Sequence, residues 1–186
     1  MIHFEFETKE FDKSFKKFRD DCNVITPLAV KKVAFDLLAG ILGGGLTGGN
    51  FSFKGKKIGS GKYAGESYGN VVTGRHPVDT GRARAGWNVS IQGLGGKANL
   101  ESGGKNIKPE AIAKGKSEGQ FTDGTNNLWN PYVELTNAVP YIVYLEYGHS
   151  AQAPAGMVRV AARKMRGKLP KLLTQEYVEN WNKFNF

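Results

Sequence analysis

One serine of this 186-residue chain, Ser117, lies between two glycines in a spacing that is typical of a catalytic nucleophile. Gly115-Lys116-Ser117-Glu118-Gly119 satisfies the G-x-S-x-G pattern of serine hydrolases, and Asp123 and His149 follow in the chain order of such enzymes. The chemistry requires the serine on a strained turn between an apolar strand and a helix. This pentapeptide instead lies in a charged, glycine-rich stretch with no apolar strand before it. We therefore do not expect Ser117 to be a nucleophile.

A second pattern, Val78-Asp79-Thr80-Gly81, is similar to the loop in which aspartic proteases hold two carboxylates that share a proton. Those loops follow an apolar strand, whereas Arg75-His76-Pro77 precedes this one and Arg82 and Arg84 follow it. An ionised Asp79 beside Arg82 is more typical of a turn and capping residue. The sequence predicts a structural turn here.

Nucleotide and metal sites are not indicated either. Gly59-Ser60-Gly61-Lys62-Tyr63-Ala64 meets the loose dinucleotide pattern, but it follows no strand, and a tyrosine after its lysine excludes a P-loop. His3, His76 and His149 share no metal-ligand spacing. Cys22 is the only cysteine, which excludes an intramolecular disulfide and a cysteine zinc cluster. We expect no catalytic residue, no cofactor and no metal, and we predict that the chain is not an enzyme.

Composition describes a basic protein without targeting signals. Lys and Arg number 26 against 17 Asp and Glu, a net charge of +9. Such a surface attracts DNA, anionic lipid or an acidic protein face, although the dispersed charges also fit ordinary solubility. Residues 1–10 do not form a signal peptide, and the longest apolar run, near Ala39–Leu42, is far too short for a membrane span. We expect a protein made in the cytoplasm and kept there or carried out inside a particle.

The elements that must position these residues begin with a long amphipathic segment. Its apolar residues recur at spacings of three and four, on one helical face: Phe11, Phe15, Phe18, Cys22 and Ile25. Pro27 interrupts the pattern after Thr26, a candidate N-cap, and residues 28–42 resume it up to Gly43. The sequence predicts two helices or one kinked helix.

Strands and a closing helix follow. Trp87, Val89 and Ile91 alternate with polar residues, which predicts a strand over 87–92, and residues 132–139 predict another. Residues 140–147 fit a strand or a short helix begun by Pro140, and we favour the helix. From Val158 an apolar stripe predicts a helix that Pro170 kinks or restarts. The order predicts an α+β fold: a small antiparallel β-sheet flanked by an N-terminal helix or kinked pair and a C-terminal helix.

Two stretches are dense in glycine, lysine and serine. Residues 43–74 and 93–124 contain few aliphatic side chains, so burial does not offset the entropy of ordering them. We expect flexible Gly-rich insertions within one domain, 1–186, ordered only in an assembly. Scattered aromatic side chains in the first stretch would anchor a partner surface: Phe51, Phe53, Tyr63 and Tyr68.

Two blocks resemble the minor tail components of long-tailed bacteriophages, including neck and tail-completion proteins of the protein-Z type. The first is Pro77-Val78-Asp79-Thr80-Gly81-Arg82-Ala83-Arg84. The second joins Pro140-Tyr141, Glu146-Tyr147-Gly148-His149 and Ala153–Ala161. The family typically shows Pro-Val-Asp-Thr-Gly, then Val-Glu-Phe-Gly-Thr, then a Pro-Phe-x-Arg-Pro-Ala helix start. Ala83 stands where the family usually has Leu, and Val160 where Pro is common.

The resemblance implies a structural virion protein of the head–tail junction. It implies a homo-oligomeric ring, hexameric or dodecameric, that joins the tail to the head connector in the neck. The partners that it implies are head connector or head-closure proteins and tail-terminator or tail-tube proteins, with packaged DNA passing through the lumen and no membrane. The location is the virion, after assembly in the host cytoplasm.

Nine residues of the two blocks are candidates for fold turns or subunit contacts: Asp79, Thr80, Gly81, Arg82, Glu146, Gly148, Arg159, Arg163 and Arg166. Gly81 permits a tight turn in which Asp79 bonds backbone amides. Glu146 and Arg159 lie in adjoining turns and would pair within or between subunits. The three arginines share one side of the closing helix, and we expect a subunit contact with Glu146 as partner.

Two other functions compete with this interpretation. The net charge and the interleaved lysines and aromatics over Lys54–Tyr68 favour a DNA-binding protein acting through basic Gly-rich loops, although no recognition helix is evident. An undetected hydrolase is the other alternative.

Overall fold

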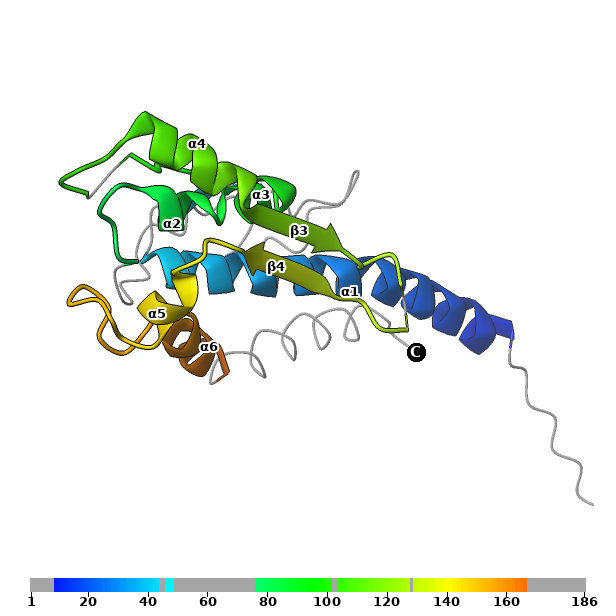
Figure 1. Ribbon diagram of the computed structural model, residues 1–186. Helices are drawn as coiled ribbons and strands as arrows, with labels where there is room; N and C mark the ends of the chain where they lie inside the picture. The colour runs from blue at the N-terminus through cyan, green and yellow to red at the C-terminus, as the bar shows by residue number, and fades with distance from the viewer. Residues whose placement is uncertain (1–8, 44–45, 49–75, 102–103, 128, 167–186) are drawn as a thin grey trace, which may run out of the picture.

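The computed structural model describes residues 9–43, 46–48, 76–101, 104–127 and 129–166 (Figure 1). Six helices and four short strands are found in this part of the chain. They are α1 (Lys9–Leu42), β1 (Leu46–Gly48), α2 (Arg82–Ala85), α3 (Asn88–Gly93), β2 (Gly96–Ala98), α4 (Pro109–Ser117), β3 (Gly119–Asp123), β4 (Val133–Asn137), α5 (Ile142–Glu146) and α6 (Val158–Arg166). The predicted α+β class is confirmed.

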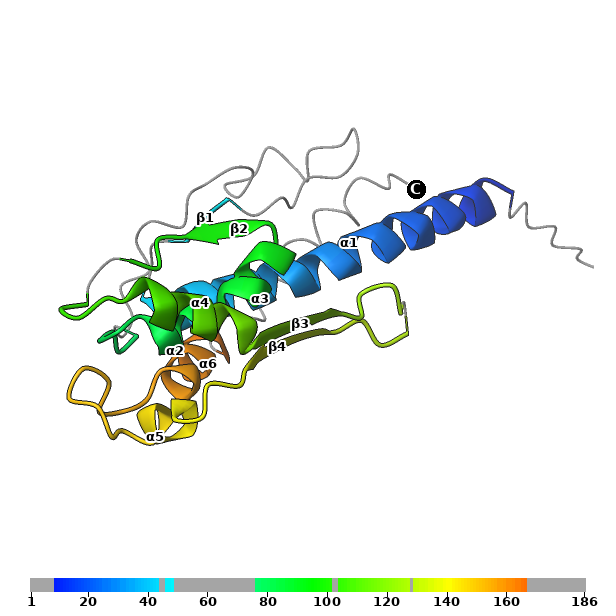
Figure 2. The same cartoon turned by 45° about the horizontal axis from the view of Figure 1, so that its top comes forward.

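Helix α1 is one continuous helix that contains Pro27. The predicted N-cap at Thr26 is wrong, because its hydroxyl donates to the Cys22 carbonyl oxygen at 2.9 Å and no helix begins there. Gly43 follows α1 with φ of 75°, the left-handed conformation that ends many helices. The N-terminal half of α1 extends beyond the other elements, and its C-terminal half lies among them (Figures 1 and 2).

The strands form two antiparallel pairs. β3 and β4 make a hairpin in which Phe121 lies opposite Leu135, and the hairpin runs beside α1 (Figure 2). β1 pairs with β2, so that Thr47 lies opposite Lys97. The predicted strand over 132–139 is therefore confirmed as β4.

The predicted strand over residues 87–92 is wrong, because Trp87 is the N-cap of α3 and residues 88–92 lie within that helix. Trp87, Ile91 and Leu94 are all buried, and their spacing of four and three places them on one helical face. The Ile91 amide donates to the Trp87 carbonyl oxygen at 3.0 Å. The alternation of polar and apolar residues also satisfied the helical period, and packing against α1 decided between the two.

Residues 93–124 are not a structureless insertion, which corrects that part of the expectation. They contain β2, α4 and β3. Pro109 stands in the first turn of α4, and Ile112 packs in a small core with Ala85 and Leu100. α4 packs closely against α2: there is no room for a Cβ on Gly115, which would overlap the Arg82 carbonyl oxygen. Few aliphatic residues suffice here since glycine lets two backbones approach closely.

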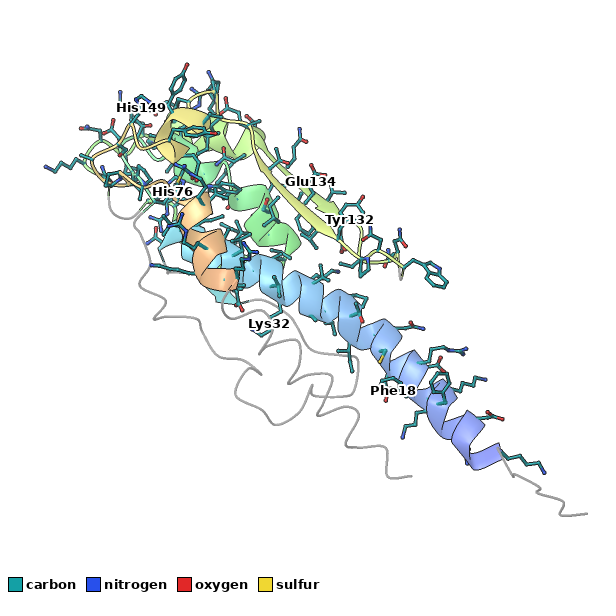
Figure 3. The ribbon with its side chains drawn as sticks, turned by 90° about the horizontal axis from the view of Figure 1, so that it is seen from below. Phe18, Lys32, His76, Tyr132, Glu134 and His149 are labelled. Atoms are coloured by element: carbon teal, nitrogen blue, oxygen red, sulfur yellow. The ribbon has the colours of Figure 1, made fainter. Side chains whose placement is uncertain are left out.

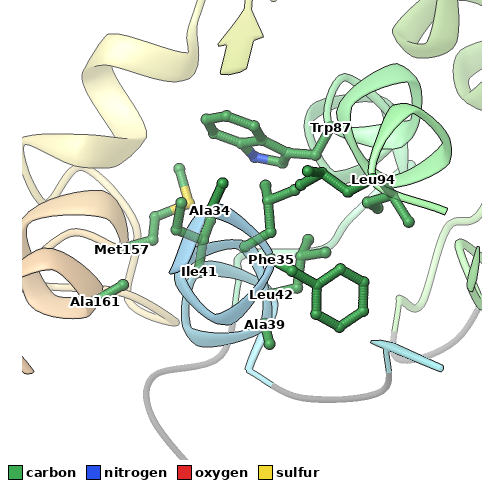
Figure 4. Packing of buried hydrophobic residues seen from close by; sticks show 11 residues of the cluster. Ala34, Phe35, Ala39, Ile41, Leu42, Trp87, Leu94, Met157 and Ala161 are labelled. Atoms are coloured by element: carbon green, nitrogen blue, oxygen red, sulfur yellow. The ribbon is translucent and has the colours of Figure 1, made fainter. Parts of the chain in front are cut away.

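The main core surrounds the C-terminal half of α1. Figure 4 shows Trp87 and Leu94 on one side of this helix and Met157 and Ala161 on the other. Phe35 is fully buried. Helices α3 and α6 are thus held in place by opposite faces of α1.

The last described segments agree with the sequence. Residues 142–146 form the short helix favoured for 140–147, and the closing helix begins at Val158. Its predicted continuation through Pro170, and residues 49–75 of the first Gly-rich stretch, lie outside the described residues. No helix among the described residues is both long and apolar enough to cross a bilayer.

Candidate functional site

The two blocks that carry the family resemblance meet in the fold. The Gln152 side chain brackets the backbone of Val78: its Oε1 accepts from the Val78 amide at 3.1 Å, and its Nε2 donates to the Val78 carbonyl oxygen at 3.3 Å. Both groups of the amide are therefore used by one residue that is 74 positions away. The Asp-Thr-Gly turn and the loop after α5 form a single region, which we take as the candidate site.

Glu146 is the most heavily bonded side chain of this region. It ends α5, and its carboxylate accepts hydrogen bonds from the backbone amides of Met157, Val158 and Arg159 at 2.9, 2.8 and 2.8 Å. These amides open α6 and have no partner within the helix. Glu146 thus caps α6 from another element, with its negative charge at the positive end of the helix dipole.

The surroundings of Glu146 favour the ionised form. Burial alone would raise the pKa of Glu146, but the three backbone amides and the Arg159 guanidinium together lower it below its ordinary value. Gly148, with φ of 90°, carries the chain around the turn. A Cβ at Gly148 would overlap the Pro154 carbonyl oxygen, so glycine is required for both conformation and space.

Arg159 completes this turn within the same chain. Its Nε lies 3.1 Å from Glu146 Oε1, its Nη2 donates to the Glu146 carbonyl oxygen at 2.6 Å, and its guanidinium lies 4.9 Å from the centre of the Tyr147 ring. The sequence left open whether Glu146 and Arg159 pair within or between subunits, and the structure shows the pair within the chain. Because its own chain occupies both oxygens, Glu146 is not the free partner that we expected for arginines of a neighbouring subunit. Arg163 and Arg166 lie farther along α6 with exposed side chains.

Asp79 is used differently from the sequence prediction. It is exposed, and its Oδ1 accepts from Asn106 Nδ2 at 2.7 Å. The expected capping bond is not made: helix α2 begins after Gly81, without a side-chain cap. Gly81 does supply the predicted turn, with φ of 89°. Thr80 contributes its carbonyl oxygen, which accepts from the Lys108 amide at 3.2 Å.

Arg82 pairs with Glu118 and not with the neighbouring Asp79. Its guanidinium makes a two-pronged contact with the Glu118 carboxylate, including Nε to Oε2 at 2.8 Å, and the side chains are each 19% exposed. The hydrogen bond from Arg82 lowers the pKa of Glu118. The pair ties α2 to the residue before β3.

A buried histidine precedes the Asp-Thr-Gly turn. His76 Nε2 lies 3.2 Å from Trp87 Nε1, and its Nδ1 lies 2.9 Å from the Pro77 carbonyl oxygen. Since the indole nitrogen only donates, Nε2 must accept, and the proton of a neutral ring sits on Nδ1. Burial, with a smaller contribution from the Arg84 charge, lowers the pKa of His76 to about 4. His76 is therefore neutral at pH 7.

The enzyme-like patterns do not gather into a reactive group in the described residues. Ser117 ends a helix that leads into a strand, the reverse of the order that a hydrolase requires, and its hydroxyl donates to the Lys114 carbonyl oxygen at 2.8 Å. No cluster of three possible metal ligands occurs in the described ranges. The loose dinucleotide pattern at 59–64 and the basic aromatic segment Lys54–Tyr68 lie outside them.

A cavity of about 610 Å³ opens between β2, α3 and α4. Its lining mixes Lys97 and Lys116 with Glu101 and the amides Asn88 and Gln92. The lining residues offer hydrogen bonds of both kinds but no nucleophile paired with a base.

Large apolar side chains are exposed at the hairpin tip and around α5, besides Phe15 and Val24 on α1. Trp129, between β3 and β4, is 99% exposed. Away from the hairpin tip, α5 exposes Val143 and Tyr144, and Tyr147 follows them. Figure 3 shows this separation through Tyr132, near the hairpin tip, and His149, beside α5. Exposed aromatic side chains of this kind are typical of protein interfaces.

The sequence did not identify Gln152, Glu118, His76 or Trp129. Gln152 and Glu118 act through contacts between distant segments, which spacing along the chain does not reveal. His76 was examined only as a metal ligand. Trp129 did carry a signal, because Asn126-Asn127 and Pro131 around it are typical of a turn that displays its residues.

Comparison of the chain with protein-family models, with curated proteins and with solved structures gives no match.

Proposed function

We propose that this chain is a structural subunit of the head–tail junction of a long-tailed bacteriophage, a neck or tail-completion protein that works in a ring and catalyses no reaction. The proposal starts from the resemblance of the two sequence blocks to minor tail components. The partners proposed with it are further copies of the chain, the head connector or head-closure protein, and the tail-terminator or tail-tube protein, with DNA passing through the lumen.

The observation that carries the proposal is that polar side chains of the second block make their hydrogen bonds within the chain. Glu146 and Arg159 bond each other and the start of α6, and Gln152 holds Val78. A catalytic carboxylate needs a free oxygen that faces a substrate. Both oxygens of the Glu146 carboxylate instead accept hydrogen bonds within the chain. The blocks therefore support a rigid frame, and what the frame presents is exposed aromatic surface suited to contacts with other subunits.

Inactivation of the gene in its phage tests the proposal. We expect lysates with filled heads and complete but separate tails, and joined particles on supplying the chain from a plasmid. The Glu146→Ala variant should fail to complement because its frame is weakened, whereas an exposed control, Glu101→Ala, should complement fully. Joined, infectious particles in the absence of the chain would refute the proposal.

A further inference from the structure

We propose that the β3–β4 hairpin tip of one copy docks on the α5–α6 face of a second copy. The hairpin tip consists of Trp129 and Tyr132, with Glu134 beside them on β4. The α5–α6 face consists of Val143, Tyr144, Tyr147, Arg163 and Arg166. This inference rests on the proposed function, because it names the surfaces through which ring neighbours touch.

The hairpin tip displays a tryptophan on a fixed support. Trp129 is 99% exposed, yet its amide and that of Asn130 donate to Asn127 Oδ1 at 3.2 and 3.3 Å. The base of the tip is held to α1, because Asp123 lies 2.5 Å from Lys31 Nζ. These bonds fix the backbone that carries the indole, and tryptophan is among the residues that contribute most to interfaces.

The α5–α6 face joins aromatic and basic surface. Val143, Tyr144 and Tyr147 are 57, 62 and 67% exposed. The Arg159 guanidinium lies over Tyr147, and Arg163 and Arg166 follow at spacings of four and three, on the same side of α6. The basic side of α6 therefore continues directly from the aromatic surface of α5.

The two surfaces have opposite charge. In the described part of the hairpin, 119–127 and 129–137, the charged residues are Asp123, which Lys31 of α1 neutralises, and Glu134, which is exposed beside Tyr132. Helix α6 carries only basic charges: Arg159, Arg163, Lys164 and Arg166. The exposed carboxylate of Glu134 beside the aromatic tip complements the basic aromatic face, and the tip itself offers no cation to a DNA phosphate or an anionic lipid. This complementarity identifies a second copy of the chain as the occupant.

The placement of the surfaces determines how copies associate. Figure 3 shows Tyr132 and Glu134 on the hairpin, and His149 at the far end of the molecule beside α5. Because the two surfaces differ and do not overlap, the contact can be made head-to-tail, the arrangement that the proposed ring requires, and each pair then keeps a free tip and a free face. Association therefore continues beyond the dimer and closes into a ring where the angle permits.

Sedimentation velocity of the full chain, over a range of concentrations, tests the contact with two complementary variants. Trp129→Ala removes the tip, and the double variant Tyr144→Ala/Arg163→Glu removes the face. Each should weaken self-association at least about 30-fold, the effect expected for an interface hot spot. An equimolar mixture of the two should form a dimer that does not grow, because it holds one intact tip and one intact face. Phe15→Ala, which removes an exposed aromatic of α1, serves as the control and should associate like the wild type.

Several results would overturn the contact. These are a wild-type chain that stays monomeric, a Trp129→Ala variant that associates normally with an unchanged circular dichroism melting curve, and a variant mixture that forms no dimer. Loss of binding to single-stranded DNA or to anionic vesicles in Trp129→Ala, with association intact, would assign the tip to those partners instead.

Head–tail joining separates the two proposals. A Trp129→Ala variant that associates like the wild type, of a chain that joining requires, overturns the contact alone. Tip-dependent association of a chain that joining does not require overturns the head–tail role alone.

Discussion

The two acidic turns of the candidate site look alike in sequence and differ in what they hold. Each places a carboxylate two residues before a glycine with φ near 90°: Asp79 before Gly81 and Glu146 before Gly148. Asp79 is exposed and accepts one hydrogen bond from an asparagine side chain, whereas Glu146 accepts three backbone amides and an arginine. The difference shows that a short motif determines the shape of a turn. How much the turn contributes to the free energy of unfolding depends on the distant segments that pack against it.

Removing the Glu146 carboxylate should have the largest effect. We expect Glu146→Ala to lower the free energy of unfolding by about 3–4 kcal/mol, because three amides at the start of α6 and the Arg159 guanidinium lose a charged acceptor. Chemical denaturation measures it, with Glu101→Ala as an exposed control. A loss below about 1 kcal/mol would mean that the two turns carry similar weight.

Mild acid should weaken the Asp79 side of the site first, through His76. The pKa of His76 is about 4 in the fold, below its ordinary value of 6.5, so between these values only the unfolded chain takes up the proton. Stability should be constant above pH 6.5 and should fall by about 2–3 kcal/mol as the pH drops towards 4. The pKa of Glu146 is lowered, so its contribution is lost only below the ordinary range for a glutamate.

The free energy of unfolding, measured by chemical denaturation at pH 7.0, 5.5 and 4.5, checks whether His76 is responsible for the first loss of stability. His76→Gln keeps an acceptor for the Trp87 indole but does not titrate, and it should remove the slope between pH 6.5 and 4.5. An unchanged slope in that variant would place the acid sensitivity elsewhere.

Alanine substitutions at Gly81 and Gly148 test how much space each turn leaves for a side chain. Both have positive φ, where alanine is strained by about 1–2 kcal/mol. A Cβ at Gly81 would lie 2.9 Å from Cγ1 of the buried Ile112, which would have to shift, whereas one at Gly148 would overlap a backbone carbonyl oxygen, which has less freedom to move. We therefore expect Gly81→Ala to cost about 1–2 kcal/mol and Gly148→Ala more than that, measured by thermal unfolding. Equal losses would show that conformation alone governs both sites.

Asp79→Ala should have the smallest effect. The sequence alone suggests a loss of about 1–2 kcal/mol through a turn bond. Because the carboxylate is exposed and bonds only the Asn106 side chain among the contacts found, we now expect about 0.5 kcal/mol or less. Asn106→Ala should give the same small change if that bond is the source. A large loss in Asp79→Ala alone would reverse the comparison.

The sequence predicted elements whose patterns are local and missed contacts that are not. The apolar spacing of α1 and α6 and the Asp-Thr-Gly turn could be read directly, since each depends on neighbours along the chain. The strand assigned to 87–92 failed because Trp87 and Ile91 satisfy both the strand and the helix period, and only the face of α1 selects the helix. The Gln152–Val78 bracket and the Arg82–Glu118 pair join positions far apart, so no local pattern announces them.

The place of the chain in an assembled particle decides whether this frame serves a head–tail junction. Cryo-electron microscopy of purified particles of the phage that is proposed to encode the chain should show a closed ring between the head connector and the tail. The density of each subunit should fit the long helix α1, the β3–β4 hairpin and the α5–α6 turn around Glu146. Joined particles whose junction is fully accounted for by other proteins, with no copy of this chain in the density, would contradict the proposal.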